Sequence, residues 1–285
     1  SLNLKLRTYK TLWGHQGDYG SAARQAIEAG FNGIEGPVPL QAAHITELES
    51  ILDLHKIDYI AEVCTAGSYV PDRQASMADH LESLAQRLPI ARQLGAHFIT
   101  CIAGCDAWPI KQSVAFFERA MDMAERQRIT ISFETHRSRT LFNPWITLDI
   151  LERLPELKLT CDFSHWCVVC ERLPDTEPDV LARVYRHAHH IHARVGYDQG
   201  PQVPHPAAPE YAAALNAHQK WWAQIWQSQL ARGYEIFTLT PEFGPDGYLH
   251  TLPFTQAPVA DLWQINCWMA EAERTHFAHL FNTVI

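Results

Sequence analysis

Long apolar runs are absent from this sequence, although 47% of its 285 residues are hydrophobic. A transmembrane helix needs roughly 18 or more consecutive apolar residues, so no membrane-spanning helix and no membrane partner are expected. The first residues also lack the apolar segment of a signal peptide, because Lys5, Arg7 and Lys10 interrupt them. We therefore expect a soluble, cytoplasmic protein.

Basic residues are few, with 23 Lys and Arg against 32 Asp and Glu, which gives a net charge of -9 with neutral His. The densest basic stretch, Arg126 to Arg139, is interrupted by apolar residues and by Glu134. Such a surface repels phosphate groups, so no nucleic-acid partner is expected.

A second Cys-x-x-Cys pair is also missing. Of the seven cysteines only Cys167 and Cys170 have this spacing, and the odd total is typical of reduced thiols in a cytoplasmic protein rather than of disulfides or a zinc ribbon. Low-complexity linkers are absent too. We therefore predict that residues 1–285 form a single domain, within the size range of barrels built from alternating strands and helices.

What is present is a repeated pattern of a short apolar strand, a polar loop and an amphipathic helix. The predicted strands are Lys5–Tyr9, Gly33–Glu35, Asp58–Val63, Phe98–Ile102, Thr130–Phe133, Lys158–Cys161, His190–Val195 and Ile236–Thr240. The predicted helices are Tyr19–Ala29, Ile45–His55, Gln74–Leu94, Val114–Arg126, Ile146–Leu154, Asp179–His187 and Ala212–Arg232. Eight such units predict an α/β fold, a (β/α)8 TIM barrel.

Local signals agree with these boundaries. Gly30, Gly95 and Gly233 follow predicted helices, where a left-handed cap is favoured, and Asp72, Asp149 and Asp179 lie near expected helix starts. Two segments are longer than a minimal barrel requires. Gly196–Pro209, rich in Pro and Gly, is predicted to be a loop. Residues 250–285 are predicted to form a C-terminal helical extension with an apolar surface for another subunit, as in a homo-oligomer.

Polar side chains gather at the carboxyl ends of the predicted strands. Glu134 follows strand five, Asp162 follows strand six, His192 lies in strand seven and Glu242 follows strand eight. Strand ends of a TIM barrel face one active-site mouth, so these four side chains are expected to converge. Carboxylate and imidazole ligands suit one divalent metal ion, Mn²⁺, Mg²⁺, Co²⁺ or Zn²⁺. A single strand-end Glu is more often part of an ion pair, but four such residues on consecutive strands favour a metal centre.

Further residues near strand ends are candidates for substrate contacts. His136 follows Glu134 directly, Trp13 and His15 follow strand one, and Glu62 lies at the end of strand three. Trp is also ordinary packing material, and Glu62 is also compatible with a supporting hydrogen-bond role. His190 is expected one layer below His192, because the two residues share a face of a regular strand.

The motifs Gly30-Phe31-Asn32-Gly33-Ile34-Glu35, Glu134-Thr135-His136, Asp162-Phe163-Ser164-His165, His190-Ile191-His192 and Pro241-Glu242 together resemble one family. It is the xylose isomerase-like sugar isomerases and epimerases, including tagatose/psicose 3-epimerases. The resemblance implies that Glu134, Asp162, His192 and Glu242 bind the metal and that Glu134 and Glu242 also form an acid/base pair. It further implies that His165 hydrogen-bonds a sugar oxygen.

One segment departs from the family pattern. Relatives that act on free sugars or polyols usually carry Lys-Asp or Asp-x-x-Arg after the strand-seven His, whereas this chain has Ala193-Arg194-Val195-Gly196-Tyr197-Asp198. Arg194 is the candidate for the cationic role, and the departure leaves the identity of the sugar or hydroxy-carbonyl substrate open.

The predicted chemistry is proton transfer beside a carbonyl through a cis-enediolate, which gives epimerisation or isomerisation. The same first step followed by loss of a β-leaving group gives a dehydratase or lyase, the main alternative. An endonuclease of abasic DNA also uses a metal barrel, but it needs a multi-metal cluster and a phosphate-binding surface. A non-catalytic carbohydrate-binding barrel is the fourth hypothesis.

Overall fold

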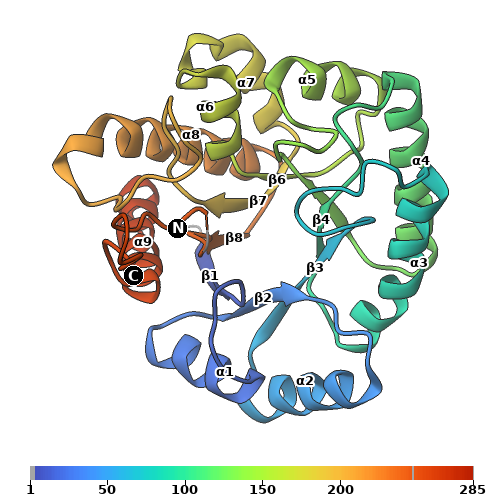
Figure 1. Ribbon diagram of the computed structural model, residues 1–285, viewed down its shortest axis with the longest axis horizontal. Helices are drawn as coiled ribbons and strands as arrows, with labels where there is room; N and C mark the ends of the chain where they lie inside the picture. The colour runs from blue at the N-terminus through green and yellow to red at the C-terminus, as the bar shows by residue number, and fades with distance from the viewer. Residues whose placement is uncertain (1–3, 246, 285) are drawn as a thin grey trace.

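The computed structural model describes residues 4–245 and 247–284. Eight parallel strands close into a barrel in the order β1 to β8, with β1 paired to β8 (Figure 1). The strands are β1 (Lys5–Thr11), β2 (Gly33–Pro37), β3 (Asp58–Cys64), β4 (Ile99–Ile102), β5 (Ile131–Glu134), β6 (Leu159–Cys161), β7 (Ala188–Ala193) and β8 (Ile236–Pro241). The predicted (β/α)8 barrel is therefore confirmed.

Helices surround this barrel as an outer ring (Figure 1). They are α1 (Tyr19–Glu28), α2 (Ala42–His55), α3 (Met77–Gln93), α4 (Ile110–Arg126), α5 (Pro144–Arg153), α6 (Ser164–Cys170), α7 (Pro178–Tyr185), α8 (Ala212–Ala231) and α9 (Leu262–Phe281). The C-terminal helix α9 packs against β1 and β8, so it covers the seam where the barrel closes.

Several local predictions differ from the structure: helices α2, α3 and α4 begin three or four residues away from their predicted starts, and further differences occur at β7 and α6. Strand β7 begins and ends two residues earlier than predicted, so Arg194 lies just beyond its carboxyl end. Helix α6 was not predicted, because its seven residues are too few to display a helical period. The Cys167 and Cys170 thiols lie on this helix, and both are free.

The helix ends show which capping signals were informative. Gly30, Gly95 and Gly233 follow their helices with φ of 80°, 69° and 89°, a left-handed conformation that favours glycine. The expectation that Asp149 marks a helix start is wrong. It lies inside α5, and Asn143 caps that helix by accepting a hydrogen bond from the Ile146 amide at 2.8 Å.

The barrel interior differs from the shell around it. Apolar side chains fill the space between barrel and helices, including the fully buried Trp222 and Trp226 of α8. Inside the barrel, the separate cluster of Tyr9, Ile60 and Phe98 packs against His190, whose ring centroid lies 5.1 Å from that of Phe98. This cluster forms a floor beneath the polar residues at the strand ends.

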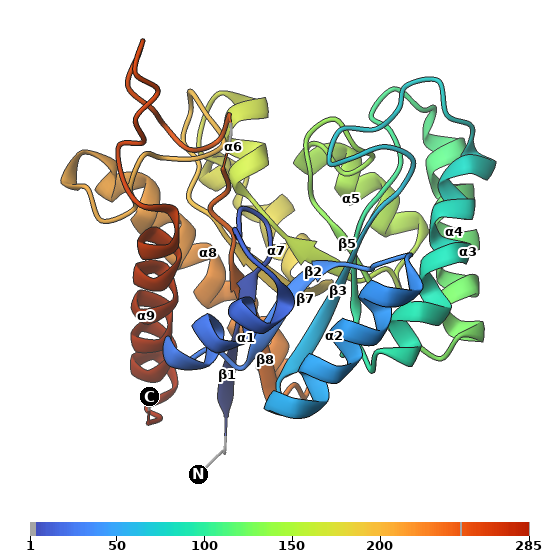
Figure 2. The same cartoon turned by 60° about the horizontal axis from the view of Figure 1, so that its bottom comes forward.

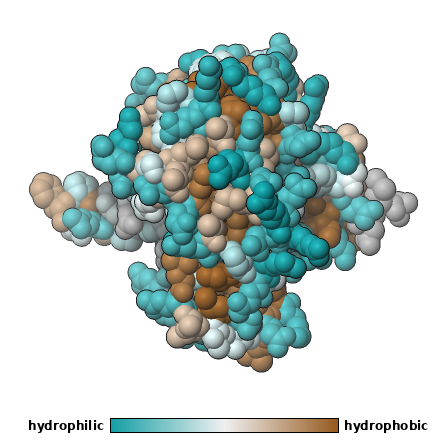
Figure 3. Space-filling model, turned by 90° about the vertical axis from the view of Figure 1, so that its right-hand side faces the viewer, coloured by the Kyte–Doolittle hydropathy of each residue, from teal (hydrophilic) through white to brown (hydrophobic). Residues whose placement is uncertain are grey.

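The outer surface is mixed in character. On the face shown in Figure 3, on the side of α3 and α4, hydrophilic residues are interspersed with smaller hydrophobic areas, as expected for amphipathic helices. The connection from β8 to α9 extends beyond one end of the barrel (Figure 2). Among the described residues, every helix is too short or too polar to cross a bilayer.

Candidate metal centre and active site

The four predicted ligands lie at the carboxyl ends of neighbouring strands. Glu134 is the last residue of β5, Asp162 directly follows β6, His192 is the penultimate residue of β7, and Glu242 directly follows β8. The carboxyl ends of the strands form the mouth of a TIM barrel, where TIM barrels carry their active sites. The four side chains therefore lie at this mouth.

Barrel closure brings these four side chains together. His192 Nδ1 lies 2.9 Å from Glu134 Oε1 and 2.7 Å from Glu242 Oε2. One ligand atom from each of these residues and from Asp162 lies within 4.8 Å of the others. All four residues are at most 5% exposed, so their charges are largely removed from water. The expected convergence is therefore present in the fold.

The donor atoms at this point fit a divalent cation. Both oxygens of Glu134, Oε2 of Glu242 and Nδ1 of His192 are buried and have no hydrogen-bond partner within residues 4–245 and 247–284. Burial of unpartnered polar atoms is unfavourable, and a cation bound between carboxylates and imidazole removes that cost. The same ligand types serve several divalent metals, so the residues do not select among them.

The electrostatics support this interpretation. Burial, reinforced by the Glu242 carboxylate, raises the pKa of Glu134 to about 8. Burial also raises the pKa of Asp162. Burial lowers the pKa of His192, but the carboxylates of Glu242, Glu35 and Glu134 outweigh it and raise that pKa well above its ordinary value. Without a cation, protons therefore compensate the crowded carboxylates, and a cation would replace them.

Arg194 is held by the Asp162 carboxylate. Its Nη2 donates to Asp162 Oδ2 at 2.9 Å and its Nε donates to Ser164 Oγ at 3.0 Å, while the Ser164 hydroxyl donates to Asp162 Oδ1. Burial opposes the charge on Arg194, but Asp162 raises its pKa above the ordinary value. Arg194 is 1% exposed, so this ion pair is almost completely removed from water.

The His136 and His165 rings lie against one another beside the four ligands, tilted by 38° with centroids 3.9 Å apart. Burial lowers the pKa of His136 to about 3 and that of His165 well below its ordinary value, so both rings are neutral at neutral pH. His165 Nε2 accepts from Arg194 Nη2 at 2.8 Å, which leaves the proton on Nδ1. That Nδ1 is buried without a partner among the described residues, and His165 is not among the residues that line the adjoining cavity.

A cavity of about 330 Å³ opens above this centre. Its lining includes Trp13, Glu62, Tyr69, His136, Arg194, Glu242 and Tyr248. The Tyr248 ring lies 5.0 Å from Trp13 and 5.9 Å from Tyr69 between centroids, and Arg194 lies 4.6 Å over the Tyr248 ring. This combination of an aromatic wall with a few polar groups and a small volume is typical of sites for small molecules.

Two candidate substrate contacts have different positions in the structure. Glu62 lines the cavity, and burial together with the Glu242 carboxylate raises its pKa well above the ordinary value. His15 is not among the residues that line it. Its Nε2 lies 2.8 Å from Ser21 Oγ, because the turn after β1 directs this side chain toward α1.

Residues that the sequence did not reveal complete the site. Glu35 of β2 contacts both His190 and His192 from beneath the centre. Arg139, fully buried, donates to the backbone carbonyls of Thr65, Ser68, Tyr69 and Gly104 and thereby holds the loop that carries Tyr69. Only Glu35 had a recognisable signal, since it is the last residue of a predicted strand and Glu134 is the first residue after one.

A larger depression, about 770 Å³, lies on the outer surface between α7 and α8. Its lining includes Tyr185 and Trp221 but none of the four predicted ligands. Volume alone therefore does not locate the chemistry, and the convergence of titratable groups favours the smaller cavity.

Close packing at Gly244 supports the aromatic wall and gives a testable prediction. A Cβ atom at this position would lie 2.1 Å from two Trp13 ring carbons, whereas a Cβ at Gly247 meets nothing within 4 Å. Gly244→Ala is therefore expected to destabilise the protein by roughly 1–3 kcal/mol through overpacking, and Gly247→Ala to leave stability nearly unchanged. Denaturant unfolding of both variants tests this, and equal stabilities would contradict the proposed wall.

The family model described as xylose isomerase-like TIM barrel matches residues 23–200. No curated protein gave a significant match. Many solved structures share the fold, and they include an endonuclease IV as well as small-molecule enzymes.

Three of these structures illustrate the range of similarity. A xylose isomerase-like TIM barrel protein from Mycobacterium smegmatis in complex with magnesium has 11% identity and a TM-score of 0.66, over 96% of this chain and 97% of that one. D-allulose 3-epimerase from Methylomonas sp. has 15% identity and a TM-score of 0.60, over 97% and 99%. The probable 3-DHS dehydratase AsbF from Bacillus anthracis has 15% identity and a TM-score of 0.59, over 94% and 98%.

At these identities the structural matches show the fold and not the reaction. The family model, in contrast, covers more than half of the chain and includes the strands that carry Glu134, Asp162 and His192. The chain belongs to the xylose isomerase-like TIM barrel family.

Proposed function

We propose that this protein is a divalent-metal-dependent isomerase or epimerase of a small sugar or related hydroxy-carbonyl compound. The observation that carries the proposal is the meeting of Glu134 and Glu242 at His192 Nδ1, with unpartnered carboxylate oxygens on both. The two carboxylates come from β5 and β8 and therefore approach the same point from different parts of the barrel.

In this proposal Glu134, His192 and Glu242 hold the cation with their unpartnered atoms. Asp162 is the fourth ligand and shares its oxygens with Ser164 and Arg194. A bound divalent cation polarises a substrate carbonyl and acidifies the adjacent C–H bond. One carboxylate of the Glu134 and Glu242 pair removes that proton, and the other returns a proton to the same carbon or to its neighbour. The first outcome is epimerisation and the second is isomerisation, and both pass through a cis-enediolate.

The residues around the pair have supporting roles. His136 lines the cavity and contacts the His165 ring behind it. We propose that the unpartnered Nδ1 of His165 donates to a substrate oxygen. Trp13, Tyr69 and Tyr248 offer the apolar surface on which the C–H face of a sugar packs. The cavity of about 330 Å³ suits a substrate of monosaccharide size.

The test is solvent exchange. The purified protein, with Mn²⁺, Mg²⁺, Co²⁺ or Zn²⁺ restored, is expected to incorporate deuterium from D₂O into at least one compound of a ketose panel, detected by NMR or mass spectrometry. The same preparation treated with a chelator is the control and is expected to lose the exchange. An absence of exchange across the panel with every metal would count against the proposal.

Elimination is the second candidate, because it shares the proton-abstraction step, and the dehydratase AsbF has the same fold. A β-leaving hydroxyl needs a proton donor. The low pKa values of His136 and His165 make imidazolium at these positions a poor candidate for that donor. Glu62, which lines the cavity and whose pKa is raised well above its ordinary value, is the better candidate. In the exchange assay an unsaturated product, visible by its ultraviolet absorbance, would indicate the lyase instead.

A further inference from the structure

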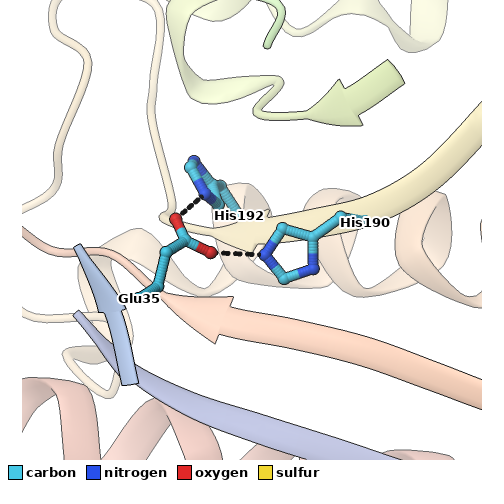
Figure 4. Close-up of side chains that lie close together, drawn as sticks. All are labelled: Glu35, His190 and His192. Carbon is cyan, nitrogen blue, oxygen red and sulfur yellow. Dashed lines mark hydrogen bonds and ion pairs between the residues drawn. The ribbon is translucent and has the colours of Figure 1, made fainter. Parts of the chain in front are cut away.

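A buried hydrogen-bonded chain lies beneath the proposed metal centre. Glu35 of β2 is 0% exposed, and its two carboxylate oxygens point at two histidines of β7 (Figure 4). Oε1 accepts from His190 Nε2 at 2.7 Å and from the Thr240 hydroxyl at 2.9 Å, and Oε2 accepts from His192 Nε2. His190 Nδ1 lies 2.8 Å from Thr238 Oγ1, which ends the chain.

These contacts determine which nitrogen of His192 faces the centre. A carboxylate only accepts hydrogen bonds, so the His192 nitrogen that meets Glu35 carries a proton. That nitrogen is Nε2, and the opposite nitrogen, Nδ1, is the one that faces Glu134 and Glu242 without hydrogen-bond geometry. The ring is therefore fixed in both orientation and tautomer when Nδ1 has no proton.

We infer that Glu35 is a positioning residue that holds His192 with its Nε2 protonated, so that Nδ1 is the atom presented to the cation. Carboxylate groups behind a ligating imidazole fix its tautomer and increase its basicity in many metal sites. His190 and Thr240 extend this support by fixing Glu35 in turn. This inference rests on the proposed metal-dependent function. It gives Glu35 and His190 a role in metal affinity, although neither residue lines the cavity.

Glu35, His190 and His192 could instead hold a metal ion themselves, below the proposed centre. Glu35, His190 and His192 also offer three ligand atoms within 4.8 Å of one another, which raises the question of an ion between them. The Glu35 oxygens, however, already accept from three donors, whereas both oxygens of Glu134, Oε2 of Glu242 and Nδ1 of His192 are unpartnered among the described residues. Asp162 is the one predicted ligand of the upper site without such an atom, because its oxygens accept from Ser164 and Arg194. The unpartnered atoms therefore favour one ion on the Nδ1 side of His192, near Glu134 and Glu242, and no ion on the Nε2 side, near Glu35.

The chain offers a matched control for a variant of Glu35. Glu273 of α9 is likewise 0% exposed and likewise paired with a histidine, since its Oε1 lies 2.9 Å from His276 Nδ1 and its Oε2 accepts from Gln219 at 2.8 Å. It lies on the outer helix ring. A substitution there removes a buried carboxylate–histidine pair without altering the barrel mouth.

The experiment measures Mn²⁺ affinity and stoichiometry by isothermal titration calorimetry and by electron paramagnetic resonance. Glu35→Ala is expected to weaken binding by on the order of 10–100-fold. Glu35→Gln is expected to weaken it less, because the amide oxygen still accepts from His192 Nε2. Glu273→Ala is expected to destabilise the fold but to leave Mn²⁺ affinity unchanged. Unchanged affinity in both Glu35 variants would overturn the inference, as would two ions per chain in the wild type.

A second measurement needs no variant and covers the case in which Glu35→Ala does not fold. Long-range ¹H–¹⁵N spectra of the wild-type protein loaded with Zn²⁺ or Mg²⁺ are expected to show His192 with its proton on Nε2, and a proton on Nδ1 would overturn the inference. If the wild-type protein bound no metal, both the proposed function and the role inferred for Glu35 would be contradicted. If metal binding depended on Glu35 but no ketose exchanged a proton with solvent, only the proposed reaction would be contradicted.

Discussion

Replacing Glu134 or Glu242 by Gln is expected to slow solvent proton exchange at the substrate carbon by on the order of 10²–10⁴-fold, the usual contribution of a positioned acid or base. Each Gln keeps the size of the side chain but cannot accept the proton. Both residues are expected to show the loss, since one removes the proton and the other returns it in the proposed reaction.

The controls separate proton transfer from metal loss, because the same carboxylates are proposed to bind the cation. Bound metal is measured in each variant, and exchange rates are compared at metal concentrations that saturate the site. Glu273→Gln, a buried carboxylate outside the cavity, is expected to retain the wild-type rate. If both site variants kept full exchange, a non-catalytic carbohydrate-binding barrel or a different acid/base pair would be the better explanation.

Arg194→Met is expected to destabilise the metal-free protein by roughly 3–5 kcal/mol, because it leaves a buried carboxylate without its partner. Arg194 and Asp162 are 1% and 0% exposed and form a 2.9 Å ion pair. The measurement is denaturant unfolding in the presence of a chelator. The double variant Arg194→Met with Asp162→Asn is expected to recover part of this loss, since no unpaired charge remains.

A surface ion pair provides the matched control for this prediction. Arg183 pairs with Glu152 at 2.5 Å, but both side chains are about half exposed, at 48% and 51%. Arg183→Met is therefore expected to change stability by less than about 1 kcal/mol. A similarly small effect of Arg194→Met would show that Asp162 is not an ionised partner of Arg194, and the charge balance proposed for the centre would fail.

Much of the fold follows from local sequence patterns. The strands appear in the sequence as short apolar runs and the helices as segments with an apolar period of about 3.6 residues, and both patterns are visible in a few consecutive residues. All eight strands were predicted near their observed positions for this reason. The short helix α6 and the two-residue displacement of β7 were missed, because seven residues show little periodicity and strand ends depend on pairing with neighbours.

The part of the candidate site that depends on strand order was predictable from the sequence. Glu134, Asp162, His192 and Glu242 end successive strands, and parallel strands that close into a barrel bring their ends together. His15 shows the limit of this reasoning. It follows a strand end as Trp13 does, yet the turn directs it to Ser21 while Trp13 lines the cavity.

The sequence by itself determined the barrel and the four side chains that meet at its mouth, because both depend on local periodicity and on strand order. Only the tertiary structure decided how these side chains are oriented and which charges compensate them. Glu35 lies 157 residues from His192 along the chain, and Arg194 lies 32 residues from Asp162. Contacts of this kind depend on barrel closure and on side-chain direction, which no local pattern encodes.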